Sequence, residues 1–111
     1  MTNTLNGKIY AAVLVPRSTR GDLEEAVLVN QLEFLLGAGI HNFVFNGATG
    51  EYCLGSPADL EICLQLARSV LPAHATYLCG VGSASLHGTL QLGRQSIEAG
   101  AEGLLVPMPY F

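Results

Sequence analysis

Tryptophan is absent from this chain of 111 residues, and charged residues make up only 13% of it, where about a quarter is usual. Half of the residues are hydrophobic, a large share for a domain with much surface relative to its core. The length suffices for one small domain, and no linker divides residues 1–111, so we expect a single unit. The scarcity of charge predicts an exposed apolar surface that serves a partner, an oligomer or a missing part of the same protein.

Basic residues are also few, and the formal net charge is −4. They are scattered along the chain as Lys8, Arg17, Arg20, Arg68 and Arg94. Without a basic stripe that could neutralise phosphates, the composition argues against nucleic-acid binding. No apolar run approaches the roughly 18 residues that cross a bilayer, and the N-terminus lacks the blocks of a signal peptide. We therefore expect no membrane segment and a cytoplasmic location.

Candidate metal ligands are sparse. The cysteines show no C-x-x-C spacing, and we expect all three to be buried structural thiols: Cys53, Cys63 and Cys79. The histidines are isolated in sequence and have no partner at metal-ligand spacing, so ordinary surface roles are expected for His41, His74 and His87. The sequence therefore predicts neither a metal site nor a cofactor.

Short apolar runs alternate with longer segments of helical spacing. The runs are nearly continuous in apolar residues, which is typical of strands covered on both faces, as in parallel sheets; they span 9–15, 42–46, 76–81 and 103–108. The helical segments span about 23–37, 57–71 and 85–99. This β-α-β-α-β-α-β order predicts an α/β fold with parallel strands, as either an open doubly wound sheet or part of a (β/α)8 barrel.

Local signals mark the ends of these helices. Asp22 and Glu25 suggest a capping box for the first helix, and Ser56 before Pro57 predicts the start of the second. In the third, apolar residues recur at Leu86, Leu90 and Ile97. The chain stops on an apolar, uncapped strand, "PMPYF". We therefore favour the N-terminal half of a (β/α)8 barrel, with parallel strands and residues 1–111 as a single partial domain.

The turn "GATG" follows the second strand, at the sheet edge where parallel α/β folds bind ligands. Gly47 and Gly50 would let the backbone approach a ligand and adopt unusual dihedral angles. The N–H groups of Ala48 and Thr49, with the Thr49 hydroxyl, could then bind a carboxylate. A tight turn without a ligand explains the pattern equally well. For Glu51 we expect that the carboxylate accepts nearby backbone N–H groups and holds the loop, rather than acting as a general base.

The segment "GVGSAS" at residues 80–85 invites a nucleotide-binding interpretation. It fails the G-x-G-x-x-G pattern because Ser85 occupies the third glycine position. Gly80 and Gly82 are therefore expected to serve packing and chain direction, and a doubly wound nucleotide-binding domain is the weakest alternative.

Taken together, "GATGE" (47–51), "CGVGS" (79–83) and "PYF" (109–111) resemble motifs of the dihydrodipicolinate synthase / N-acetylneuraminate lyase family, specifically of its N-terminal half. The resemblance covers nearly the whole chain. It implies a (β/α)8 barrel and class I aldolase chemistry on pyruvate or a related 2-keto acid, in which a lysine on a later strand forms a Schiff base. It also implies that Thr49 and the Ala48 amide bind the keto acid's carboxylate, and that Tyr110 places a phenol near the site.

Three departures from the family pattern stand out. The only lysine is Lys8, which should lie roughly 20 Å from the ligand face at about 3.3 Å per strand residue. The chain alone should therefore be inactive. Ala48 and Phe111 stand where the synthases carry hydroxyls of a proton relay, which favours another keto-acid aldolase or lyase of the family.

A non-catalytic α/β binding or assembly module is the second hypothesis. A half-barrel leaves two open sheet edges and an uncovered apolar interior, both prone to association. The expected partners are accordingly a small 2-keto acid such as pyruvate, and either further copies of the chain in a homo-oligomer or the missing C-terminal half-barrel.

Overall fold

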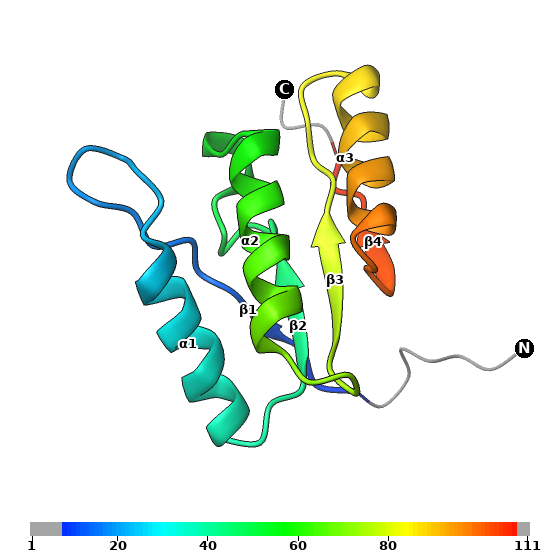
Figure 1. Ribbon diagram of the computed structural model, residues 1–111. Helices are drawn as coiled ribbons and strands as arrows, with labels where there is room; N and C mark the ends of the chain where they lie inside the picture. The colour runs from blue at the N-terminus through cyan, green and yellow to red at the C-terminus, as the bar shows by residue number, and fades with distance from the viewer. Residues whose placement is uncertain (1–7, 109–111) are drawn as a thin grey trace, which may run out of the picture.

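The computed structural model describes residues 8–108, which form a four-stranded parallel sheet with three helices packed on one face (Figure 1). The strands lie in sequence order, β1-β2-β3-β4. The elements are β1 (Ala11–Ala12), α1 (Glu25–Gly37), β2 (Asn42–Phe45), a 3-10 helix η1 (Tyr52–Leu54), α2 (Pro57–Val70), β3 (Thr76–Gly80), α3 (Leu86–Glu98) and β4 (Gly103–Leu105). This order confirms the predicted α/β fold and corresponds to the first half of a (β/α)8 barrel.

The hydrophobic core lies between the sheet and the helices. Phe43 and Phe45 of β2 point into it and are fully buried, as are Leu28 and Leu32 of α1 and Leu64 of α2. Side chains alternate across a strand, so the register places another set on the opposite face, where Ala12 pairs with Val44 and Gly80 with Leu105. Leu105 is 40% exposed on that face, which in a closed barrel would be the interior.

The first strand and first helix differ from expectation. The first strand is predicted over residues 9–15, but only Ala11–Ala12 form a regular strand. The Val13 amide still donates to the Val44 carbonyl at 2.9 Å. The capping box of Asp22 and Glu25 is wrong, because the helix N-cap is Glu24, whose side chain forms no cap hydrogen bond. Asp22 belongs instead to a turn in which its amide donates to the Ser18 hydroxyl at 3.2 Å.

The second helix begins as the sequence predicts. The Ser56 hydroxyl accepts a hydrogen bond from the Asp59 amide at 3.2 Å, and Pro57 takes the first helical position. Helix α3 is capped in the same way by Ser85, whose hydroxyl accepts from the Gly88 amide at 2.9 Å.

The apolar residues that recur along α3 do not face the core. Leu86, Leu90 and Ile97 are 76%, 48% and 62% exposed. The buried side of the helix contains Gly93 and Ser96 together with Leu92. A Cβ at Gly93 would lie 3.5 Å from the Leu104 side chain, an ordinary van der Waals distance, so Gly93 is a point at which α3 packs on β4.

Exposed apolar side chains gather along both edges of the sheet. One set lies on the β1 and α1 side: Ile9, Leu14, Val27 and Phe34. The other lies on the α3 and β4 side: Leu86, Leu90, Ile97, Leu105, Val106 and Met108. These two sets are called the β1 edge and the β4 edge below, and they confirm the exposed apolar surface expected from composition. No helix within residues 8–108 is long and apolar enough to cross a membrane.

Candidate functional site

The carboxyl ends of β2 and β3 are locked together beside the "GATG" turn. Asn46, at φ +58°, donates from its side-chain amide to the Gly80 carbonyl at 2.9 Å. A Cβ at Gly80 would lie 2.0 Å from the Asn46 carbonyl oxygen, and a Cβ at Gly82 would lie 2.4 Å from the Tyr52 ring. Both glycines therefore serve close packing, as expected. The role of Asn46 was missed by the sequence analysis, although its place at the end of an apolar strand was the available signal.

The turn itself closes through its own backbone. The Glu51 amide donates to the Ala48 carbonyl at 3.0 Å, and the Tyr52 amide donates to the Gly47 carbonyl at 3.3 Å. The expectation of unusual dihedral angles at Gly47 and Gly50 is wrong: the positive φ angles fall on Asn46 and Glu51, at either side. Gly50 is buried, and a Cβ there would lie 3.2 Å from the Val13 carbonyl oxygen, so glycine relieves a tight contact with the backbone that follows β1.

Glu51 shapes the loop through its backbone and not, as expected, through its carboxylate. Its carboxylate makes no capping hydrogen bond to η1, and the residue is exposed. Its backbone, at φ +57°, turns the chain into η1, and its carbonyl accepts from the Leu54 amide at 2.9 Å.

Ala48 and Thr49 form the exposed tip of the turn. Among the hydrogen bonds of residues 8–108, none uses the amide of Ala48, the amide of Thr49 or the Thr49 hydroxyl. Consecutive unpaired donors at the carboxyl end of a parallel strand are suited to an anionic oxygen. The geometry therefore permits carboxylate binding at this tip.

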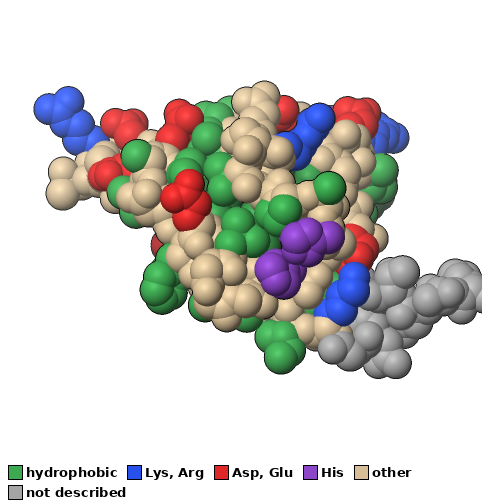
Figure 2. All heavy atoms as spheres, turned by 60° about the horizontal axis from the view of Figure 1, so that its bottom comes forward, with side chains coloured by type: hydrophobic (Ala, Val, Ile, Leu, Met, Phe, Trp, Pro, Cys, Tyr) green, Lys and Arg blue, Asp and Glu red, His purple; other side chains and the backbone are tan. Residues whose placement is uncertain are grey.

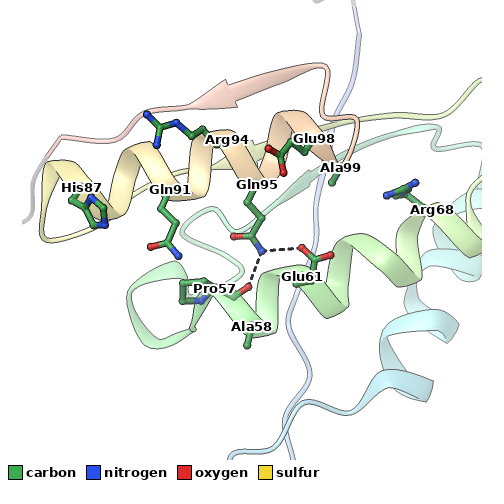
Figure 3. A pocket seen from close by; sticks show the side chains of 10 residues that line it. All are labelled: Pro57, Ala58, Glu61, Arg68, His87, Gln91, Arg94, Gln95, Glu98 and Ala99. Atoms are coloured by element: carbon green, nitrogen blue, oxygen red, sulfur yellow. Dashed lines mark hydrogen bonds between the residues drawn. The ribbon is translucent and has the colours of Figure 1, made fainter.

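Two of the hollows near the helices bear on the choice of site. One, of about 260 Å³, lies beside the turn and includes Asn46, Tyr52, Ser56 and Gly82 among its lining residues. A larger one, of about 780 Å³, runs between α2 and α3 on the helical face (Figure 3). There, the Gln95 side-chain amide donates to the Pro57 carbonyl at 2.8 Å and to Glu61 at 3.2 Å, so it joins the two helices.

The larger groove mixes charges of both signs: Glu61, Glu98, Arg68 and Arg94. Figure 3 shows Arg94 and Arg68 at separate places along the groove rather than converging on one point. His87 lies in this groove, is exposed, and is not among the residues that line the hollow beside the turn. The groove consequently offers no single point at which like charges would hold one ligand, and the turn is the better candidate.

Lys8 lies at the amino ends of the strands, opposite the turn. Its ammonium donates to the Glu102 carboxylate at 2.8 Å, and the Tyr10 hydroxyl donates to the same carboxylate at 2.6 Å. The hydrogen bond from Lys8 holds the pKa of Glu102 below its ordinary value. Burial, with the Glu102 carboxylate beside it, raises the pKa of Tyr10 to about 12. We interpret this cluster as structural, because it joins Lys8 and Tyr10, which precede β1, to Glu102, which precedes β4.

The thiols divide into two kinds. Burial raises the pKa of both Cys63 and Cys79 to about 11, so each stays protonated near neutral pH, as structural thiols do. The expectation that all three cysteines are buried is wrong for Cys53, which is exposed. Cys53 belongs to the short η1 helix, which contains no buried residue.

The histidines are not all isolated. His41 and His74 lie with their ring centroids 4.8 Å apart. The sequence separation hid this contact, although the two residues precede successive strands. Tyr110 and Phe111 lie outside the described residues, so the geometry of the site here is that of residues 47–50 and their neighbours.

Comparisons with known proteins place these features in context. A model of the dihydrodipicolinate synthetase family matches residues 5–111. The chain is 31% identical over 105 residues to a 4-hydroxy-tetrahydrodipicolinate synthase of Methanoculleus marisnigri, a match that covers 93% of this chain and 36% of the relative. It is also 31% identical over 107 residues to the corresponding synthase of Bifidobacterium longum, covering 95% and 34%. The chain thus spans about a third of the length of these curated relatives.

Solved structures share the fold. A prophage protein of the dihydrodipicolinic acid synthase family from E. coli K12, solved in complex with pyruvate, superposes with a TM-score of 0.86 at 23% identity, over 97% of this chain and 36% of that one. The N-acetylneuraminate lyase of Mycoplasma synoviae gives a TM-score of 0.85 at 22% identity, over 98% and 38%.

Proposed function

The chain belongs to the dihydrodipicolinate synthetase family, and on that premise we propose that it supplies the carboxylate-binding part of a Schiff-base-forming 2-keto acid aldolase or lyase. Its family is one of aldolases of the dihydrodipicolinate synthase and N-acetylneuraminate lyase type. The proposed substrate is pyruvate or a related 2-keto acid, and one solved relative was crystallised with pyruvate.

The observation that carries the proposal is the exposed tip of the turn. The amides of Ala48 and Thr49 and the Thr49 hydroxyl have no partner among residues 8–108, and Gly47 and Gly50 hold the tip at the carboxyl edge of the sheet. We assign the keto acid's carboxylate to these donors. Tyr110 would add a phenol beside them.

The reactive amine must come from elsewhere in the whole protein. Lys8 is the only lysine of the chain, and its ammonium is held by Glu102 at the far end of the strands. The protonated imine formed by a lysine on a later strand would draw electrons from the adjacent carbon, which permits its deprotonation or cleavage of its bond to an aldehyde. On this proposal residues 1–111 are a partial domain that does not react alone.

Two positions bear on which keto acid is used. Ala48 has no hydroxyl where the synthases of the family are expected to carry one, and Phe111 has none where a second tyrosine is expected. A proton relay through both positions is therefore broken. We propose a keto-acid aldolase or lyase other than dihydrodipicolinate synthase in the strict sense.

Titration of the 15N-labelled chain with pyruvate tests the binding role directly. The Ala48 and Thr49 amide resonances should shift, while acetone, which has the ketone but no carboxylate, should leave them in place. Thr49→Val should weaken the response, because it removes one donor to the carboxylate. The matched control is Thr89→Val on α3. Equal shifts with acetone, or an unchanged response in T49V, would refute the assignment.

The covalent role needs the whole protein. Borohydride added with pyruvate should trap a labelled lysine there, and the 111-residue chain alone should remain unlabelled. Labelling of Lys8 in the short chain would contradict the proposal, since Lys8 is bound to Glu102 and distant from the turn.

A non-catalytic assembly module is the second candidate, and the exposed β1 and β4 edges favour it. Contiguous apolar surface beside open strands promotes association. On the aldolase proposal these edges are covered by further βα units of the whole protein. On the assembly proposal a second copy covers them, and the short chain forms a stable dimer that binds no keto acid.

A further inference from the structure

The imidazoles of His41 and His74 meet at the amino ends of the strands. His41 immediately precedes β2, and His74 lies two residues before β3. Their ring centroids are 4.8 Å apart with an interplanar angle of 61°, and both residues are exposed. Figure 2 shows histidine side chains gathered on the face that forms the bottom of Figure 1, where the loops before these strands lie.

The backbone beneath the pair is fixed by the sheet. The Thr76 amide donates to the His41 carbonyl at 3.0 Å, which extends the β2–β3 ladder to the residue that carries the first imidazole. The Ala75 amide donates to the Pro72 carbonyl at 3.0 Å and closes the turn that carries the second. The spacing of the two rings thus follows from strand register, and little chain entropy remains to be lost when both bind one ligand.

The spacing matches that of a chelate. Two imidazoles on one tetrahedral zinc, at Zn–N distances of about 2.0 Å, place their ring centres roughly 5 Å apart. The observed 4.8 Å agrees with this separation. Because both side chains are exposed, rotation about the Cβ–Cγ bonds can turn one nitrogen of each ring towards a common ion.

We propose that His41 and His74 form a two-histidine site for a divalent transition metal that prefers imidazole, such as zinc, copper or nickel. No group of three or more His, Cys, Asp or Glu within residues 8–108 is arranged to hold a metal. Water, or a donor from another molecule, completes the coordination. The site lies at the opposite end of the sheet from residues 47–50, so it is independent of the proposed keto-acid chemistry.

Bound metal would tie together the loops that enter β2 and β3. A ligand that binds only the folded state stabilises that state in proportion to the logarithm of its concentration over Kd. The consequence is a thermal midpoint that rises with zinc concentration and returns on addition of a chelator.

Zinc titration of the 111-residue chain, followed by the imidazole resonances in NMR, tests the site. The chain has three histidines, so His87 is an internal control. The His41 and His74 resonances should shift together while His87 stays in place. Calorimetry should give one zinc per chain. Because the second imidazole acts at high effective concentration, His41→Gln and His74→Gln should each weaken binding roughly 100-fold.

His87→Gln is the matched control and should bind zinc like the unaltered chain. Far-UV circular dichroism compares the folding of the three variants, whose substituted side chains are all on the surface. Equal shifts of all three histidines, or single variants at His41 and His74 that retain the original affinity, would overturn the proposal. An unaltered chain in which zinc moves no imidazole resonance would overturn it as well.

Discussion

Replacing Gly80 by alanine should both destabilise the protein and displace the turn at residues 47–50, which follows Asn46. The new Cβ would lie 2.0 Å from the Asn46 carbonyl oxygen and 2.8 Å from its carbonyl carbon. Both are backbone atoms, so no side chain can move aside to relieve the clash. The ends of β2 and β3 must separate instead.

The expected loss can be worked from two contributions. Overpacking of a well-packed region costs about 1–3 kcal/mol. Separation of the strand ends also breaks the hydrogen bond from Asn46 to the Gly80 carbonyl, worth about 1 kcal/mol. The free energy of unfolding should fall by roughly 2–4 kcal/mol. For a domain of this size that lowers the thermal midpoint by about 4 °C per kcal/mol, or roughly 8–16 °C.

Urea unfolding followed by circular dichroism measures this loss, since the chain has no tryptophan for fluorescence. Gly37→Ala is the matched control, because a Cβ there meets nothing within 4 Å at the last residue of α1. That variant should be neutral or slightly more stable. If G80A unfolds at the same urea concentration as G37A, the close approach of β3 to Asn46 does not exist as described.

Two further predictions concern the Lys8–Glu102 ion pair and the exposed β4 edge. Because Lys8 lowers the pKa of Glu102, the stabilisation from this carboxylate is present above the pKa of an unfolded glutamate and is lost as pH falls through the folded value. Glu102→Gln should cost about 1 kcal/mol at pH 7; urea titrations should show that difference vanish in acid, and a constant difference would contradict the ion pair. Ile97→Lys, at a position 62% exposed, should reduce association in light scattering without lowering stability; a large stability loss would place Ile97 in the core instead.

Local chemistry explains why the helices were predictable. Ser56 accepts from Asp59 three residues away, and Pro57 needs no partner for its missing N–H. Such contacts lie within one turn of helix, so the order of nearby residues specifies them. The order of parallel strands was predictable for a related reason, because short connections through a helix constrain neighbouring strands to pair in sequence.

The packing face of α3 was not predictable in this way. Its leucines recur at helical spacing, yet the buried side holds Leu92, Gly93 and Ser96, and Gly93 lies beside the Leu104 side chain of β4. Helical periodicity identifies a row of apolar residues on one side of a helix, but it does not identify the element against which that side packs. The exposed stripe at Leu86, Leu90 and Ile97 belongs to the open β4 edge.

By itself, the sequence determined the element order, the cap of α2, the family and the position of the "GATG" turn at a strand end, because these depend on short-range chemistry and on motif identity. Only the tertiary structure decided that Gly80 must lack a side chain against Asn46, and that His41 and His74 share one surface. Both contacts join residues more than thirty positions apart, on successive βα units. Strand register, which no local pattern of residues encodes, sets the distance between them.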